Sequence, residues 1–370
     1  MSKFVILSDV SWDGNQHINH YLAEQLSERG HEVLFIDRFF IHNISFKTLY
    51  IYITRLLYKV RQLAFWSNYD TYLNQTRSST LVKVKKILGI SEGSKLLQAY
   101  LKRCISNQFG DPDFIVSFVP NANAIWLMEE FENATLAYYN THDFRLFDNF
   151  KKTQELEIKL MSICSFVFSD NINVLQDLRK THRLSNLEKN INPSFTYIPP
   201  PVPEAFYNSL VSPVKEFDFC YFGSIDRKFN KEVLIGLVEK NLSVLIIGSD
   251  YQPVQSPLIK YQPGVRDPRL LVHQISRSKY ILLPYKNDRF SSAVSPGKIN
   301  QCKALRLPIM LTNKTIAEEF SIKYFDFESD SVEDYINNPS TYQCTENYHS
   351  LQSVSVPNIC TNILRILNGC

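Results

Sequence analysis

A loop of small hydroxyl-bearing residues leads into a short helical segment in the second half of the chain. Ser292 and Ser295 precede Lys298 and Gln301, and an apolar run follows at 307–311. Free backbone N–H groups and the helix dipole make the start of a helix a favourable place for an anion. Lys298 adds a full positive charge there. The segment predicts a diphosphate site; the alternatives are that the serines only cap the helix and that the lysine is solvated.

A second loop with side chains that could take part in catalysis follows the apolar run 134–139 and contains His142 and Asp143. A carboxylate at the end of a buried strand can take a proton from a substrate hydroxyl as a general base. We therefore predict that Asp143 is a catalytic base and that His142 contacts the substrate. The alternative is that Asp143 caps a helix over 144–150.

Two further loops follow apolar runs that read as strands. Gly223 and Ser224 can approach phosphates closely, because glycine has no side chain. The loop after the first strand offers polar and aromatic groups to an acceptor, with a tight turn as the alternative: Trp12, Asp13, Gly14, Gln16 and His17. His17 and His20 lack a third ligand, so we expect no metal site.

Alternating short apolar runs and helical segments predict an α/β fold with parallel sheets. In the first half, strands are expected at 4–8, 32–37, 114–118, 134–139 and 166–169, and helices at 17–29, 154–164 and 172–182, with a basic helix pair over 80–107. In the second half, strands are expected at 217–223, 244–248, 280–285 and 308–311, and helices at 231–240, 267–278, 298–305 and 357–367.

The proline-rich stretch after Tyr197 divides this alternation into two α/β halves, because consecutive prolines fit neither a central strand nor a helix interior. We predict an acceptor-binding domain at 1–198 and a hinge at 199–204. A nucleotide-binding domain would follow at 205–355, and a helix at 356–370 would close back toward the N-terminal domain. Two Rossmann-like domains facing across a cleft are the expected architecture, with ligands at the carboxyl ends of the strands.

Composition excludes several classes of protein. The chain has 370 residues, 44% of them hydrophobic and 21% charged, as in ordinary soluble globular proteins. Its seven cysteines form no Cys-x-x-Cys pair, which favours reduced thiols in the cytoplasm over disulfides or zinc. We expect no signal peptide and no membrane span.

Charge is uneven along the chain. Residues 38–103 hold twelve Lys and Arg but two acids, a net charge of +10, and they are rich in aromatic residues. This make-up is typical of segments that lie on an anionic membrane surface. The alternative is amphipathic helices with a solvated basic face. No nucleic-acid-binding motif accompanies the patch, so we exclude nucleic acid as a partner.

These segments together resemble glycosyltransferases of the GT-B type over nearly the full length. The Ser295, Lys298 and Gln301 spacing is similar to the membrane-associated glucuronosyltransferase of xanthan biosynthesis and its relatives, whose matching residues hold UDP. Gln301 stands where many other relatives have Glu, and Leu305–Arg306 replaces their Ala and Gly. The acidic pair of retaining relatives is missing.

The resemblance implies an inverting, metal-independent transferase that uses a UDP-sugar and no cofactor. Gly264, Val265 and Arg266 resemble the segment whose backbone reads the base. The acceptor would be a lipid-linked saccharide in capsule or exopolysaccharide assembly, with the enzyme peripheral on the inner face of the membrane. A retaining enzyme using GDP- or dTDP-sugars, an epimerase or phosphorylase of the same fold, and a degenerate partner subunit remain alternatives.

Overall fold

The computed structural model describes residues 1–12, 16–37, 95–146, 150–185, 192–208, 214–248, 251–288, 291, 297–343 and 352–369, and the backbone of 82–86. The predicted site residues Asp13, Gly14, Ser292 and Ser295, and most of the basic segment 38–103, lie outside these residues. The chain divides into two compact units, at 1–197 and 198–368. The proline-rich segment and the last helix both belong to the second unit.

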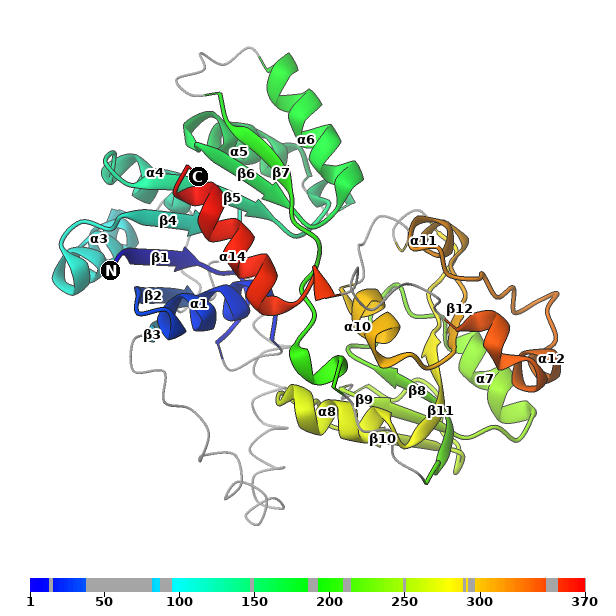
Figure 1. The fold of residues 1–370 in the computed structure, drawn as a ribbon. Helices are drawn as coiled ribbons and strands as arrows, with labels where there is room; N and C mark the ends of the chain where they lie inside the picture. Colours follow the sequence, from blue (N-terminus) through cyan, green and yellow to red (C-terminus); the bar gives the residue numbers. More distant parts are fainter. Residues whose placement is uncertain are drawn as a thin grey trace. The chain divides into compact units, whose positions relative to one another are not determined.

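The first unit is built on one parallel sheet of seven strands, in the order β3-β2-β1-β4-β5-β6-β7 (Figure 1). Its strands are β1 (Lys3–Leu7), β2 (Glu32–Asp37), β3 (Val82–Lys86), β4 (Phe114–Ser117), β5 (Thr135–Asn140), β6 (Phe166–Ser169) and β7 (Ser194–Tyr197). Its helices are α1 (Ile18–Glu28), α3 (Lys95–Phe109), α4 (Ala122–Glu130), the 3-10 turn η1 (Phe144–Leu146), α5 (Phe150–Ile163) and α6 (Ile172–Leu184).

Both faces of this sheet are buried. Along β1, Val5 and Leu7 join one hydrophobic cluster with residues of α3, α4 and α5, while Phe4 and Ile6 on the opposite face are also fully buried. Successive side chains of a strand point to opposite faces, so continuous burial requires cover on both sides. This explains why the strands read as unbroken apolar runs.

One predicted element is wrong. Residues 82–86 form β3, which pairs in parallel with β2, and not part of a helix pair. Val82 and Val84 alternate with lysines, a period of two that indicates a strand, whereas the high charge of the segment suggested a basic helix. The helix of that predicted pair is found, as α3. Strand β7 and helix α4 were not predicted, nor were three elements of the second unit: β10 (Ile259–Gln262), α11 (Lys314–Glu319) and α12 (Val332–Asn337).

The second unit holds a parallel sheet of five strands, in the order β10-β9-β8-β11-β12. Its strands are β8 (Phe217–Phe222), β9 (Val244–Ile247), β10 (Ile259–Gln262), β11 (Ser278–Leu283) and β12 (Ile309–Leu311). Its helical segments are η2 (Glu204–Phe206), α7 (Lys231–Glu239), α8 (Pro268–Ile275), α10 (Lys298–Leu305), α11 (Lys314–Glu319), α12 (Val332–Asn337), η3 (Pro339–Tyr342) and α14 (Val356–Leu367).

The proline-rich segment is anchored within the second unit. Val202 N–H donates to Val354 O at 2.8 Å, and Val356 N–H donates to Val202 O at 3.1 Å. Asn300 Nδ2 of α10 also reaches Pro200 O at 3.4 Å. These bonds place extended proline backbone directly beside the start of α10.

The expected fold class is confirmed: each unit is a parallel α/β domain of the Rossmann-like kind. In both units, parallel strands that lie side by side must be joined by crossover connections, and helices form these connections. The strand ends that matter for ligands are therefore the carboxyl ends, the edge at which the loops after each strand emerge.

Candidate active site

Two glycines bring backbone close to backbone at the carboxyl edge of the second sheet. Gly223 follows β8 and donates its N–H to Ile247 O at 2.7 Å; Gly248 follows β9 and donates to Gln262 O at 2.9 Å. Both have positive φ, +120° and +99°, which disfavours other residues. A Cβ on Gly248 would lie 3.4 Å from the Cα of Gly223. The two turns are thus in contact.

The side chain of Lys298 lies directly against Gly223. A Cβ at Gly223 would stand 1.8 Å from Lys298 Nζ, so only glycine leaves room for this lysine. Lys298 is the first residue of α10, and its ammonium donates to Tyr221 Oη at 3.5 Å. The ammonium also lies 4.9 Å from the centre of the Tyr221 ring, within cation–π range. We call Gly223, Gly248 and Lys298 the lysine cradle.

Lys298 is a cation in an environment that disfavours its charge. Burial and, to a lesser extent, the nearby Lys228 together lower the pKa of Lys298 to about 8, against weaker opposing effects of Asp226 and Cys302. Among the described residues, no carboxylate forms a salt bridge with it, since the Asp226 carboxylate pairs with Lys228 at 3.5 Å. An incoming anion would therefore meet a positive group that lacks an ion-pair partner in the described part of the chain.

The other predicted donor-binding residues surround this edge or follow it. Ser224 is exposed, and its carbonyl accepts from Tyr221 Oη at 2.6 Å. Gln301 lies one turn beyond Lys298 on α10 and is partly exposed. The loop after β10 carries Gly264, which is exposed, Val265, which packs on the hydrophobic core, and Arg266, whose Nε and Nη2 are buried. Their roles stay predictions.

Gly248 was missed as a site residue. The sequence prediction placed it at the end of a strand, where its lack of a side chain had no evident purpose. A glycine at the carboxyl end of a buried strand, followed by polar residues, was the available signal. The reason for a glycine at this position is the backbone of Gly223 after β8, which lies against it.

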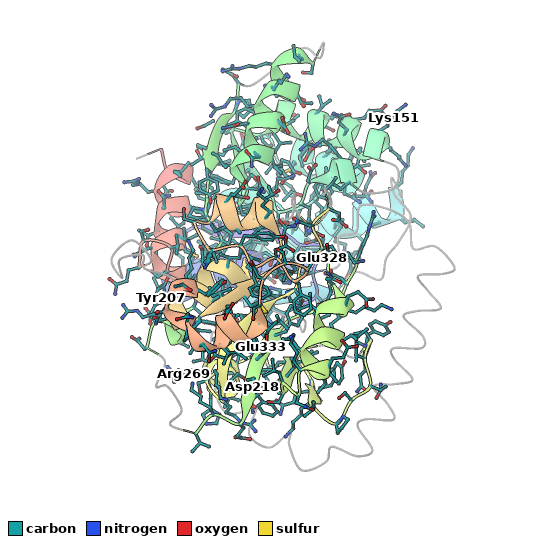
Figure 2. All side chains as sticks on the ribbon, turned by 90° about the vertical axis from the view of Figure 1, so that its right-hand side faces the viewer. Lys151, Tyr207, Asp218, Arg269, Glu328 and Glu333 are labelled. Carbon is teal, nitrogen blue, oxygen red and sulfur yellow. The ribbon has the colours of Figure 1, made fainter. Side chains whose placement is uncertain are left out.

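The amino edge of the same sheet carries ion pairs of a different kind. Asp218, labelled in Figure 2, accepts from Ser243 Oγ at 2.9 Å and from Lys279 Nζ at 2.8 Å. These contacts lower the pKa of Asp218 against the effect of burial, and Asp218 raises the pKa of Lys279. The lysine at this edge has a carboxylate partner, so its charge serves to join neighbouring strands.

In the first unit, serine hydroxyls fix the loops at the carboxyl edge. Ser8, Ser117 and Ser169 each follow or end a strand, and each donates its hydroxyl to the backbone carbonyl two residues later at 2.8–3.2 Å. All three are fully buried. Loops held in this way can present side chains at defined positions.

Asp143, the predicted base, is bound to an arginine. Arg145 Nε donates to Oδ1 and Nη2 donates to Oδ2, both at 2.7 Å, and the Asp143 side chain is 6% exposed. Arg145 also pairs with Asp177. Hydrogen bonds to Asp143 are the main cause that raises the pKa of the guanidinium. Asp143 therefore begins the η1 turn as a buried, bidentate partner, and its catalytic role stays a prediction.

His142 is placed beside two carboxylates from other loops. Its Nε2 lies 3.7 Å from Oδ2 of Asp9, in the loop after β1, and its side chain is 43% exposed. Asp170 follows β6; burial raises its pKa to about 7, and the nearby His142 acts in the opposite direction. The imidazole thus lies 3.7 Å from a carboxylate of one distant loop and interacts electrostatically with an aspartate of another.

A buried acid lies near this loop. Glu157 of α5 accepts from Tyr138 Oη at 2.6 Å and from Asn140 Nδ2 at 2.9 Å. Burial raises the pKa of Glu157 to about 7, although both hydrogen bonds favour its charged form. The contacts tie α5 to β5 and so support the position of the loop that carries His142.

The remaining predicted acceptor residues have structural contacts. Trp12 packs edge-on against Phe35, with 4.9 Å between ring centres, and near His20. His20 is buried; its Nδ1 accepts from His17 N–H at 3.1 Å, and its Nε2 faces Ser11 O at 3.0 Å. Both nitrogens of His20 thus contact backbone. Gln16 approaches Glu24 at 3.4 Å, and the side chain of His17 is exposed.

Within the described residues, no three His, Cys, Asp or Glu side chains gather in a way that could hold a metal ion. None of the helices in that part of the chain combines the length and hydrophobicity that a membrane span requires.

The chain matches no protein-family model and no curated protein sequence, but solved structures share its fold. Anabaena HepE in complex with UDP and glucose is 12% identical with a TM-score of 0.62, and the match covers 100% of both chains. Trehalose 6-phosphate synthase from Burkholderia multivorans is 10% identical with a TM-score of 0.62, covering 100% of this chain and 99% of that one. UDP-GlcNAc 2-epimerase from Methanocaldococcus jannaschii is 12% identical with a TM-score of 0.51, covering 100% of both.

At such low identity these similarities show the fold, which is that of GT-B enzymes with two Rossmann-like domains. The expected GT-B architecture is confirmed in this respect. The narrower resemblance to the glucuronosyltransferase of xanthan biosynthesis stays a prediction.

Proposed function

We propose that this protein is a glycosyltransferase that takes a sugar from a UDP-sugar. The observation that carries the proposal is the lysine cradle, a partly buried ammonium held against a glycine turn at the carboxyl edge of a parallel sheet. This edge is where ligands of such sheets bind. Two of the solved structures with this fold, HepE with UDP-glucose and UDP-GlcNAc 2-epimerase with UDP-GlcNAc, contain a UDP-sugar, which supports the choice of nucleotide.

The cradle suits a diphosphate leaving group. Negative charge grows on the diphosphate as the bond from the sugar to phosphate breaks, and a positioned cation stabilises it. Lys298 would supply this charge in place of a metal ion. Gly223 leaves the room in which the Lys298 ammonium lies at this edge, and Gln301 would reach the phosphates or the ribose. Ser292 and Ser295 are proposed to donate to the same oxygens.

The reaction is proposed to invert the configuration at the anomeric carbon. In inversion the acceptor hydroxyl attacks from the side opposite the diphosphate, and one base removes its proton. The retaining alternative needs no such base. Measuring the anomeric configuration of the product by NMR decides between them, and a product with the donor's configuration would refute inversion.

A nucleotide panel tests the proposal most directly. We expect UDP to raise the melting temperature of the wild-type protein more than GDP or dTDP, with a further response to at least one UDP-sugar. If none of the three nucleotides stabilises the protein, the donor site is wrong. If GDP or dTDP stabilises it most, the alternative with another nucleotide sugar is favoured.

The epimerase alternative has support from the fold, because several structural neighbours are UDP-GlcNAc 2-epimerases. The two activities differ in their products. A transferase releases UDP, while the epimerase returns an intact UDP-sugar with altered stereochemistry. Incubation with UDP-GlcNAc followed by separation of UDP from UDP-sugars distinguishes them. A protein that binds UDP but does neither would be a degenerate partner subunit.

We further propose that the acceptor is lipid-linked and is met at an anionic membrane surface, and that the enzyme acts in surface polysaccharide assembly. Helix α3 supports it. Its Leu96 and Tyr100 are 85% and 49% exposed, one turn apart, with Lys95 and Arg103 exposed beside them. The helix contains no Asp or Glu. Exposed apolar groups among cations match an anionic lipid surface.

We expect the double variant Leu96→Asp/Tyr100→Asp to lose binding to vesicles that contain phosphatidylglycerol, because it removes apolar contact and adds negative charge. Vesicle sedimentation measures this, with pure phosphatidylcholine vesicles for comparison. Leu184→Asp is the matched control, since Leu184 is 71% exposed on α6. Unchanged binding of the double variant would exclude α3 as the membrane contact.

A further inference from the structure

The environment of His142 suits proton transfer better than that of Asp143. The His142 side chain is 43% exposed and faces Asp9, whereas Asp143 is 6% exposed and gives both oxygens to Arg145. A base needs access to the hydroxyl whose proton it takes. It also gains from a neighbouring group that orients it and stabilises its charged form. His142 has both features. Asp143 is buried, and Arg145 occupies both of its oxygens, so it offers no free oxygen to an acceptor hydroxyl.

We propose that His142 is the catalytic base that deprotonates the acceptor hydroxyl, oriented by Asp9 and Asp170, and that Asp143 holds Arg145 as a structural partner. The proposal rests on the glycosyltransferase function proposed above. In the described residues, the Asp9 carboxylate after β1 lies 3.7 Å from His142, and the charge of Asp170 after β6 interacts with it electrostatically. Asp143 and Arg145 stand on the same loop as His142. Asp9 and Asp170 are positioning residues, since they act through the imidazole.

The acceptor O–H bond breaks and its proton moves to a ring nitrogen of His142. The oxygen forms a bond with the anomeric carbon, while the bond from that carbon to the diphosphate breaks and UDP leaves with the electron pair. The imidazolium that results lies beside the Asp9 carboxylate, whose negative charge stabilises it. The imidazolium then returns its proton to solvent, which the exposure of the side chain allows.

Water serves as the probe acceptor, so the test is slow UDP release from UDP-glucose and UDP-glucuronic acid without added saccharide. His142→Gln is expected to lower this rate about 100-fold or more, while the rise in melting temperature on adding UDP stays as in the wild type. Asp143→Asn is expected to lose less than His142→Gln. His31→Gln is the matched control, because His31 lies at the amino end of the same sheet and its Nδ1 accepts from Ser2 N–H.

A second readout separates orientation from a merely structural role. In Asp9→Asn the acidic limb of the pH–rate profile should move to lower pH, because the carboxylate that favours the imidazolium is gone. A His142→Gln rate equal to wild type, or an Asp143→Asn loss as large as that of His142→Gln, overturns the proposal. If the wild type binds UDP and releases it from a UDP-sugar but His142→Gln keeps the wild-type rate, His142 is not the base and the transferase function still stands. If the wild type releases no UDP from either sugar, the function and this proposal fall together.

Discussion

Lys298→Met is expected to raise the stability of the free protein and to abolish its response to UDP. Methionine keeps most of the lysine's shape and removes a charge that burial disfavours. Lowering the pKa from 10.5 to about 8 corresponds to about 3 kcal/mol of unfavourable free energy when the lysine is charged. Losing the contact with a diphosphate should weaken UDP binding roughly 100-fold, or about 3 kcal/mol.

The pH dependence of this effect has a defined sign. The pKa of Lys298 is lower in the folded than in the unfolded protein, so the cost of its charge is complete below pH 8 and disappears as pH rises towards 10.5. The stability gain of Lys298→Met should therefore be large at pH 6.5 and small at pH 10. Thermal unfolding of the wild type and of Lys298→Met at both pH values, with and without UDP, measures the stability gain and the response to UDP at each pH.

Lys279→Met is the matched control for this experiment. Lys279 lies on β11 of the same sheet and pairs with Asp218 at 2.8 Å, so its charge is favoured by the fold. Its replacement should leave the stability unchanged or lower it, and should preserve the response to UDP. A Lys298→Met protein that still responds to UDP like the wild type would remove Lys298 from the donor site.

Gly223→Ala is expected to abolish UDP binding with only a moderate loss of stability. The new Cβ would lie 1.8 Å from Lys298 Nζ and 2.4 Å from Cε. Because these atoms end a flexible side chain, the lysine should move away while the fold persists. The ammonium would then leave the place where the diphosphate needs it. Isothermal titration with UDP measures the loss of binding, and thermal unfolding measures the loss of stability.

Gly110→Ala separates backbone strain from this displacement. Gly110 also has a positive φ, +73°, but a Cβ there meets nothing within 4 Å. Its replacement should cost only the conformational strain of about 1–2 kcal/mol and leave UDP binding intact. If Gly223→Ala binds UDP as tightly as Gly110→Ala does, the close contact of Gly223 with Lys298 has no part in recognition.

Much of the fold could be read from apolar periodicity. Runs such as 4–8 and 166–169 are buried on both faces of a parallel sheet, so their composition alone marks them as strands. The segment 82–86 was misread because its lysines hid an alternation with valine. The short strand β10 carries Lys260, Tyr261 and Gln262, and edge strands of this kind lack the continuous apolar run.

The sequence by itself determined that Lys298 begins a helix after a hydroxyl-rich loop and that glycine follows a strand at Gly223, because caps, turns and strands depend on near neighbours in the chain. Only the tertiary structure decided that Gly223 lies against both Gly248 and Lys298, and that His142 lies 3.7 Å from Asp9. These contacts join loops after different strands. Strand order sets them, and strand order follows from packing across the whole sheet.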